Sequence, residues 1–388
     1  MTDITVSPPS DVDEFKAFVP IHRRTYLMSP EDGETWAGSV DLENFRIARR
    51  GDRMIGGMSL RPMGQWFGGR SVAMTGISAV GIEPQERASG AGTTFMRTVL
   101  EELHATGVPL SALYPATQTI YRRCGYELAG DHLRYSINAD EIDVRDRSLE
   151  IAHTTDREAI AAVYAERSPR TAGVLDRTPK MWERTFEPWK SETDSYLVLG
   201  TDAPEGYIVY SRGRGEYVRA HMYADVVALT PAAARRILTF VVDHKSFIDD
   251  VAWIGPAADP FTFQLAEPRR KVTMSWPWML RIIDVRRALG ERGYAPTHES
   301  ELHLRVRDDL LPANDGAFVL RVSGGKGEVE SGGDGRLQID VRGLAPLYSG
   351  YASAHELIST GYIEGAEADL GLADAVFAGP APWMADFF

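Results

Sequence analysis

A strand, a glycine-containing loop and a helix follow one another in VGIEPQERASGAGTTF, and this order constrains the fold more than any other stretch of the chain. The strand is predicted to end at Ile82, and the helix to begin at Thr93 or close by. Gly90 and Gly92 let the loop backbone approach a ligand, and the unpaired N–H groups of a helix start attract anions. The stretch therefore predicts a cradle for a phosphate or pyrophosphate group. The helix is expected from six apolar residues at helical spacing: Ala91, Phe95, Met96, Val99, Leu100 and Leu103.

The residues on either side of the cradle predict an α/β unit. Three or four strands with glycine-containing turns are expected between residues 44 and 82, and LSALYP forms a short strand after the helix. A helical turn follows at QTIYRRCGY. The order strand, loop, helix, strand is typical of the α/β class.

The cradle lacks the two most common phosphate-binding motifs, because neither G-x-G-x-x-G nor G-x-x-x-x-G-K-[ST] occurs there. Its spacing, Arg87-x-x-Gly90-x-Gly92, resembles the acetyl-CoA motif of the GNAT acyltransferases. The resemblance implies that the strand edge hydrogen-bonds the pantetheine arm and that the loop amides hold the pyrophosphate. The acetyl-CoA-binding residues would be Val80, Gly81, Ile82, Arg87, Ala88, Ser89, Gly90, Gly92 and Thr93.

A second motif follows the next strand. Tyr121-x-x-x-Gly125-Tyr126 resembles the GNAT pattern in which the first tyrosine faces the sulfur of CoA. A phenol with a pKa near 10 stays protonated at neutral pH and can protonate a departing thiolate. The resemblance therefore implies that Tyr121 is the general acid. A packing aromatic is the alternative role for this residue.

Two further domains are predicted after the first. HMYADVVALTPAAARRILTFVVDH has the strand–Pro–helix order of the first third without its glycines, which indicates either an internal repeat or a chance likeness. Apolar and polar residues alternate around glycine-rich turns in FVLRVSGGKGEVESGGDGRLQIDVRG, as they do in β-hairpins. The whole plan, with the stretch LRIIDVRRALGERGYA, resembles the enhanced intracellular survival (Eis) family of acetyltransferases. It implies an α/β (α+β) fold with a catalytic GNAT domain at 1–140, a degenerate GNAT-like domain at 141–283 and a sterol-carrier-protein-like domain at 284–388.

Composition excludes several classes of function. The formal net charge of −13 argues against nucleic acid and anionic membranes as partners, since both attract clustered Lys and Arg. No apolar run is long enough to cross a bilayer, and no signal peptide is expected in MTDITVSPPSDVDEF, which has neither a basic start nor an apolar core. The single cysteine, Cys124, excludes an intramolecular disulfide and suits the cytoplasm. The nine histidines fall into no metal-binding pattern, so no metal is expected.

The chain ends in APWMADFF, although chain ends are normally polar and frayed. An apolar end predicts that the terminus is held against the protein, and its carboxylate must then be partnered or used. In the Eis family the C-terminal carboxylate reaches the first domain's active site. The resemblance therefore implies that the Phe388 carboxylate accepts a proton from the acceptor amine or orients it. In water an α-carboxyl, with a pKa of about 3.3–3.7, is a poor base, and partial desolvation raises that value.

The acceptor pocket departs from the family's pattern. Family members that acetylate aminoglycosides carry one acid in the N-terminal helical region and another just before the final aromatic. With Trp36 aligned to the usual tryptophan, the first position falls on or near Tyr26, and the second holds Phe387. Three acids close in sequence offer a compensating charge, although a surface acidic loop is the expected role for them: Glu31, Asp32 and Glu34. A polycationic sugar would lose charge-assisted hydrogen bonds worth about 1.5–3 kcal/mol each. A more apolar or aromatic amine is therefore expected, with Tyr26, Trp36 and Phe387 in the pocket.

The sequence thus predicts an acetyl-CoA-dependent N-acetyltransferase that acts on a primary amine of a small molecule by direct attack. Two alternatives stay open: a protein lysine as acceptor, and a non-catalytic protein that binds acyl-CoA or lipid. Retention of both motifs favours the enzyme. A homo-oligomer, specifically a hexamer, is implied only by the resemblance.

Overall fold

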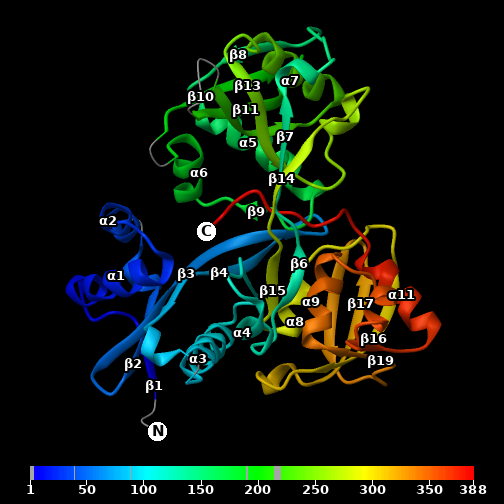
Figure 1. The fold of residues 1–388 in the computed structure, drawn as a ribbon. Helices are drawn as coiled ribbons and strands as arrows, with labels where there is room; N and C mark the ends of the chain where they lie inside the picture. The colour runs from blue at the N-terminus through cyan, green and yellow to red at the C-terminus, as the bar shows by residue number, and fades with distance from the viewer. Residues whose placement is uncertain (1–3, 39, 88, 189–190, 214–219) are drawn as a thin grey trace.

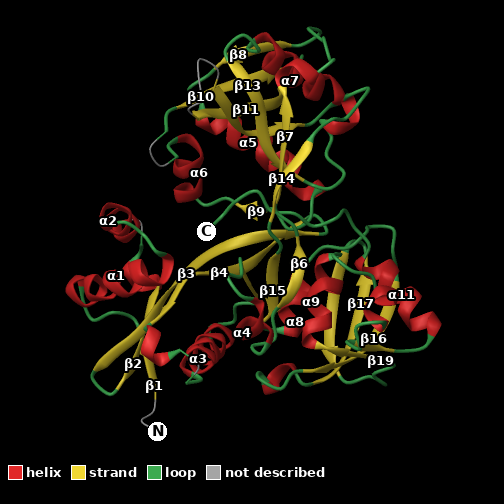
Figure 2. Cartoon of the chain, viewed as in Figure 1, coloured by secondary structure: helices red, strands yellow, loops and turns green. Residues whose placement is uncertain are grey.

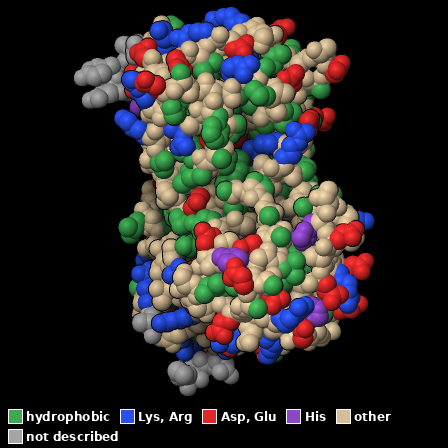
Figure 3. All heavy atoms as spheres, turned by 90° about the vertical axis from the view of Figure 1, so that its right-hand side faces the viewer, with side chains coloured by type: hydrophobic (Ala, Val, Ile, Leu, Met, Phe, Trp, Pro, Cys, Tyr) green, Lys and Arg blue, Asp and Glu red, His purple; other side chains and the backbone are tan. Residues whose placement is uncertain are grey.

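The computed structural model describes residues 4–38, 40–87, 89–188, 191–213 and 220–388. Within them, three β-sheets carry helices on their faces, which confirms the predicted fold class (Figures 1 and 2). The second sheet forms the upper lobe in Figure 1, and the first and third sheets lie side by side below it. The molecule narrows between the lobes, and hydrophobic side chains gather at the narrowing (Figure 3). No described helix has the length and apolar character needed to cross a membrane.

The first sheet is built around two long antiparallel strands, β3 and β4. In sheet order its strands are β1 (Ile4–Ser7), β2 (Phe45–Arg50), β3 (Arg53–Phe67), β4 (Arg70–Ile82), β5 (Leu110–Leu113), β15 (Trp278–Ile282) and β6 (Glu127–Gly130), and the short β9 (Leu175–Asp176) pairs with β3. Helices α3 (Ala91–Ala105) and α4 (Gln118–Arg122) pack on one face, with all six predicted apolar residues of α3 buried. Helices α1 (Val12–Tyr26) and α2 (Pro30–Gly38) cover part of the opposite face.

The second sheet repeats the plan of the first. Its order is β14 (Lys271–Ser275), β7 (Leu133–Asn138), β13 (Ile248–Gly255), β12 (Ala220–Ala228), β11 (Pro204–Gly213), β10 (Thr193–Leu199) and β8 (Glu150–His153). Helices α5 (Arg157–Arg167), α6 (Pro179–Phe186) and α7 (Pro231–Asp243) accompany it. The parallel pair β12–β13 corresponds to β4–β5, with α7 in the place of α3.

The first two sheets exchange a strand. β7 follows β6 in the chain but pairs with β13 and β14 of the second sheet. β15 comes from the far end of the second sheet's sequence and inserts between β5 and β6 of the first. β7 lies in the predicted first domain (1–140) and β15 in the predicted second domain (141–283), so each sheet contains a strand from the other domain's range. The domain boundaries at 140 and 283 stay predictions.

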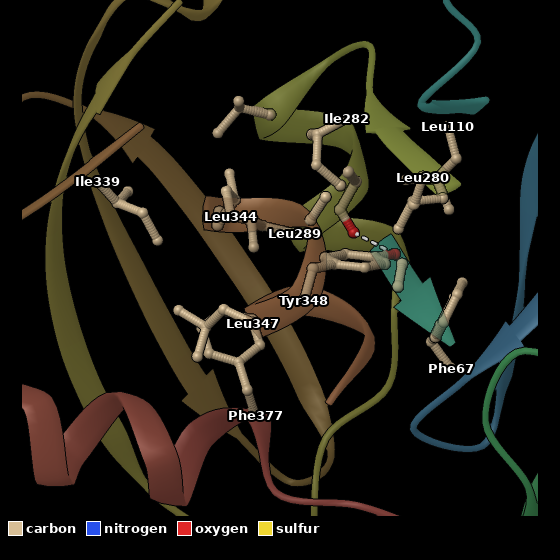
Figure 4. Packing of buried hydrophobic residues seen from close by; sticks show 14 of the residues in the cluster. Phe67, Leu110, Leu280, Ile282, Leu289, Ile339, Leu344, Leu347, Tyr348 and Phe377 are labelled. Carbon is tan, nitrogen blue, oxygen red and sulfur yellow. Dashed lines mark hydrogen bonds between the residues drawn. The ribbon is translucent and has the colours of Figure 1, made fainter. Parts of the chain in front are cut away.

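The third domain packs its core directly on the first sheet. Its strands are β18 (Lys326–Ser331), β17 (Gly316–Ser323), β16 (Ser300–Arg307), β19 (Leu337–Asp340) and β20 (Ile363–Glu364), and its helices are α8 (Val285–Glu291), α9 (Val341–Ser349), α10 (Ala354–Ile358) and α11 (Glu367–Phe377). In Figure 4, Tyr348 of α9 lies between Phe67 of β3 and Leu289 of α8. Its hydroxyl donates to the carbonyl of Ala288 at 3.2 Å. One continuous apolar core therefore joins the two domains.

A buried ion pair also joins them. Arg281, on the exchanged strand β15, donates to both carboxylate oxygens of Asp308 at 2.8 and 2.7 Å, and both side chains are almost fully buried. Asp308 also accepts hydrogen bonds from the backbone N–H of Leu311 and from the amide of Asn314. The pair ties the exchanged strand to the third domain.

We predict that Asp308→Asn lowers the free energy of unfolding by about 3–5 kcal/mol, because it leaves the Arg281 charge buried without its partner. Glu330→Gln is the control, since it removes an exposed partner of Arg321 and should change stability by less than about 1 kcal/mol. Urea denaturation followed by circular dichroism measures both. Equal shifts for the two variants would contradict the prediction.

Candidate active site

Strands β4 and β5 separate after a short stretch of pairing. They are hydrogen-bonded only from Met74 to Gly76 on β4, so no described strand covers the β4 edge from Ile77 to Ile82. The register with β3 also shifts beside Ala79, which has a left-handed φ of 54°. A bulge of this kind bends a strand and increases its twist. The result is a strand edge without a neighbouring strand on the β5 side, and it includes Val80, Gly81 and Ile82, which were predicted to bind the pantetheine arm.

The predicted pyrophosphate cradle lies at the end of this open edge. Gly90 is the residue before α3 and has a left-handed φ of 85°, which glycine adopts without strain. The Ser89 hydroxyl donates to the Glu86 carbonyl at 2.7 Å and so shapes the turn. The backbone N–H groups of Gly92 and Thr93 open the helix without an intrahelical partner. Arg87 is exposed beside them, and Ala88 lies outside the described residues.

Tyr121 lies on α4, packed on the α3 face of the sheet. Its side chain is buried, and burial raises the pKa of its phenol, so the hydroxyl holds its proton throughout the physiological range. No described residue forms a hydrogen bond with this hydroxyl, whereas the hydroxyl of Tyr126 is bonded to Ser111 at 2.7 Å. The Tyr121 hydroxyl therefore keeps its proton at neutral pH, and no described residue accepts a hydrogen bond from it.

Gly92 and Gly125 lie where a larger residue would clash with the elements around Tyr121. A Cβ on Gly125 would lie 2.8 Å from the Arg281 guanidinium, and its φ of 83° is left-handed. A Cβ on Gly92 would lie 2.8 Å from the side chain of Ile120, the neighbour of Tyr121. Glycine at both positions lets α3, α4 and the exchanged strand approach closely.

Tyr26 and Trp36 lie near each other at the edge of the first sheet. The ring of His22 stacks on Trp36 with centroids 3.7 Å apart and contacts Tyr26 at 4.6 Å. The Tyr26 hydroxyl donates to the Val80 carbonyl at 3.3 Å, so Tyr26 touches the open edge of β4. Trp36 is half-buried among Phe15, Phe18 and Phe45, where it packs α1 and α2 on the sheet.

The C-terminal segment crosses from α11 to the space between the two lobes and is tied down along its length (Figure 1). Trp383 forms a bridge to Asp131, and the Met384 carbonyl bonds to the His132 ring at 3.0 Å. Tyr114 donates to the carbonyl of Asp386 at 3.2 Å. These contacts confirm that the apolar terminus is held against the protein.

The strongest of these ties is a buried ion cluster. Arg177, whose side chain is 3% exposed, donates to Asp386 at 3.0 Å through Nε and to Asp225 at 2.7 and 3.1 Å through its two Nη atoms. Tyr207 donates to Asp225 at 2.9 Å. Burial favours the neutral acid, yet Arg177 holds the pKa of Asp225 below its ordinary value. Neither Arg177 nor Asp386 was predicted as functional from the sequence, because their partner on the β12 strand lies far away in the chain.

The two terminal phenylalanines point to different places. The Phe388 ring lies against Gly76, where a Cβ would come within 2.5 Å of it, and 5.8 Å from the ring of Tyr114. Because Gly76 is the last β4 residue paired with β5, Phe388 sits where the two strands part. Phe387 instead packs on Tyr114 and His132, each at 4.3 Å, and faces the second lobe.

A cavity of about 320 Å³ opens beside Phe388. Its walls come from β3, from α6 with the residues before it, and from the turn before β2. It contains none of Tyr26, Trp36 and Phe387, so the structure does not bring the three predicted pocket residues together there. Its lining residues are Asp41, Asn44, Ser59, Leu60, Arg61, Pro62, Met63, Thr178, Pro179, Lys180, Met181, Arg184 and Phe388.

The described residues of the second domain form no equivalent cradle. Its helix α7 begins with Pro231, which has no N–H, and the Thr230 hydroxyl already accepts from the N–H of Ala233 at 3.1 Å. Glu205, which accepts from Thr230 at 2.5 Å, adds a negative charge at this helix start. An anion would find few free donors here, as expected for a degenerate copy.

Among the described residues, no group of three or more His, Cys, Asp or Glu side chains is arranged to hold a metal ion.

Comparison with known domain families divides the chain into three matched regions. Residues 9–129 and 173–282 each match an acetyltransferase (GNAT) domain, and residues 285–385 match a sterol carrier protein domain. The two GNAT matches identify the likeness between the first and middle thirds as an internal repeat.

Solved structures with the same fold cover the whole chain. A GCN5-related N-acetyltransferase from Anabaena variabilis is 37% identical, with a TM-score of 0.95 over 100% of both chains. Eis1 from Mycobacterium abscessus shares the fold with a TM-score of 0.82 at 23% identity, again over 100% of both chains. An uncharacterised N-acetyltransferase of Streptomyces griseus is 29% identical over 83% of each chain.

We predict that Gly76→Ala displaces the Phe388 ring, because the added methyl group would lie 2.5 Å from it. Carboxypeptidase should then release Phe388 several-fold faster than from the unaltered protein, as followed by mass spectrometry. Gly379→Ala is the matched control in the same tail, since its added methyl meets no atom within 4 Å. Equal release from both variants would show that the ring does not depend on Gly76.

Proposed function

The chain belongs to the GCN5-related N-acetyltransferases, and we propose that it acetylates a primary amine of a small molecule at the junction of β4, β5 and the C-terminus. One observation carries this proposal: the Phe388 ring lies on Gly76, at the point where β4 and β5 part. The end of the chain thus lies where the open β4 edge begins, and the cradle lies beyond the other end of that edge.

Acetyl-CoA is the co-substrate of GNAT domains. In this proposal its pantetheine arm adds along the free β4 edge at Val80 to Ile82, as a peptide strand does on a sheet. The pyrophosphate binds the N–H groups of Gly92 and Thr93, where the α3 dipole favours negative charge. Tyr26 occupies one carbonyl of that edge, at Val80, and would share or release it when the arm binds.

Acetyl transfer then proceeds by direct attack. The amine nitrogen bonds to the thioester carbon, the carbon–sulfur bond breaks, and the amine loses a proton. The Phe388 carboxylate accepts this proton, directly or through a water, and Tyr121 gives its proton to the departing thiolate. Burial raises the pKa of the Tyr121 phenol, so it holds its proton at neutral pH and can donate a hydrogen bond to the sulfur as negative charge develops there.

The finer features of the sequence prediction stay proposals. They include the cytoplasm as location, the homo-oligomer and the choice of a small-molecule amine over a protein lysine. An apolar or aromatic pocket has weaker support, since the cavity beside Phe388 contains charged side chains and none of Tyr26, Trp36 and Phe387. The sterol-carrier-like domain uses its interior for packing against the first sheet, which favours a structural role over lipid transport.

We predict that deleting Phe388, or extending the chain beyond it by Gly-Ser-Gly, lowers kcat by about 100-fold or more while acetyl-CoA still binds. The extension keeps the ring but removes the free carboxylate at that position. Turnover is measured by thiol release, and acetyl-CoA binding by calorimetry. The same extension placed before Met1 is the control. Normal turnover of the C-terminally extended enzyme would exclude a catalytic carboxylate.

We predict that Tyr121→Phe lowers kcat by about 100-fold without unfolding the protein, because it removes only the proton donor. Tyr126→Phe in the same motif is the control. It breaks the buried bond to Ser111 and should reduce stability by about 1 kcal/mol with a much smaller effect on kcat. Similar kcat values for the two variants would assign Tyr121 a packing role.

A further inference from the structure

The cavity beside Phe388 is basic. Three cations line it, Arg61 on β3 and Lys180 and Arg184 on α6, against a single acidic side chain, Asp41. Asp41 is already paired with Lys180 at 3.0 Å. Phe388 adds the α-carboxylate of the chain end to this wall, but within the described residues neither arginine forms an ion pair with it or with Asp41.

The contacts of the two guanidinium groups support this. Arg61 is half-buried, and its Nε donates at 3.0 Å to the neutral hydroxyl of Ser78 on β4. Burial lowers the pKa of Arg61, the like charge of Arg184 lowers it further, and the Asp41 carboxylate opposes this shift. Arg184 forms no ion pair within the described part of the chain. Of the other buried arginines, Arg177 and Arg281 pair with carboxylates, whereas Arg236 and Arg292 donate to backbone carbonyls.

A pair of unpartnered arginines at a binding site suits an anion. A guanidinium offers parallel N–H donors that match the oxygens of a carboxylate or a phosphate, and such charge-assisted bonds are among the strongest in proteins. A bound anion would also relieve the repulsion between Arg61 and Arg184. A polycationic acceptor would increase it.

The position of Arg61 relates a bound anion to the proposed site of acetyl transfer. Arg61 pairs with Gly76 across the two strands, and the Phe388 ring lies on Gly76. The guanidinium therefore lies on the sheet face that holds the terminal residue, one strand away from it. An acceptor with its amine at the Phe388 carboxylate can reach Arg61 and Arg184 with its other end.

We propose that the acceptor is an amine that also carries an anionic group, a carboxylate or a phosphate, which binds Arg61 and Arg184 while the amine faces Phe388. This inference rests on the proposed function and names the substrate class of the same site. It differs from the aromatic, uncharged pocket expected from the sequence.

The test compares three benzylamines that differ only at the para position, which carries a methyl, a carboxylate or a phosphate group. Wild-type enzyme should have its highest kcat/KM with one of the two anionic compounds. The preferred one shows whether the acceptor carries a carboxylate or a phosphate. In Arg61→Gln and Arg184→Gln the ratio of kcat/KM for the anionic over the methyl compound should fall by roughly 10- to 100-fold. Arg61→Lys should retain part of the preference.

Arg321→Gln is the matched control, because it removes an exposed arginine on β17 of the third domain, outside the cavity wall. A methyl compound that wild-type enzyme prefers, or a preference that Arg61→Gln and Arg184→Gln leave unchanged, would overturn the inference while leaving N-acetyltransfer established. Arg184 lies on an exposed helix face, so Arg184→Gln tests the idea even where Arg61→Gln fails to fold.

Calorimetric titration of the same compounds into enzyme loaded with CoA separates this inference from the proposed function. If an anionic compound binds more tightly than the methyl compound and Arg184→Gln removes this difference, anion recognition is supported. If no compound is acetylated as well, only the proposed reaction is contradicted. Equal binding of all three compounds overturns the inference.

Discussion

The ion cluster of Arg177 with Asp386 and Asp225 is the interaction on which the candidate active site depends. A buried arginine is tolerated only with partners, and here one partner belongs to the second sheet and the other to the C-terminal segment. Arg177 itself follows β9, which pairs with the first sheet. A single guanidinium therefore relates three parts of the chain, and the last two residues take their positions from it.

Strand exchange makes this relation rigid. If the two GNAT-like units were linked only by a loop, the cavity between them would vary with their relative motion. Because β7 and β15 each complete the other unit's sheet, backbone hydrogen bonds cross between the units in both directions. Arg281 on β15 then pairs with Asp308 and fixes the third domain to the same frame. A terminal carboxylate can serve as a catalytic group only if its distance from the first domain is fixed in this way.

The parts of the candidate site that are formed by neighbouring residues in the chain could be predicted from the sequence. The end of β4, the helix α3 with its buried positions and the helical turn that holds Tyr121 all came from residues near one another in the chain, where period and turn chemistry act directly. The exchange of β7 and β15 could not be predicted, because each strand satisfies the same alternation in either sheet. The partner of Asp386 was invisible for a similar reason: nothing in the tail indicates an arginine more than 200 residues earlier. The sequence assigned Phe388 to catalysis and Phe387 to the acceptor pocket, but it could not show that the first ring packs on Gly76 and the second on Tyr114.

This division between local and distant residues also explains how one fold can hold one co-substrate and different acceptors. The residues proposed for acetyl-CoA lie within a single stretch from Val80 to Thr93, where strand geometry and the helix start do the binding through backbone groups. The cavity proposed for the acceptor takes its walls from β3, α6, the turn before β2 and the chain end, and side chains such as Arg61 and Arg184 give it positive charge. Backbone recognition survives most side-chain substitutions, whereas side-chain recognition changes with each one. In this proposal, a change of charged side chains around the terminus would alter the charge of the acceptor that fits without altering the cradle for the acetyl donor.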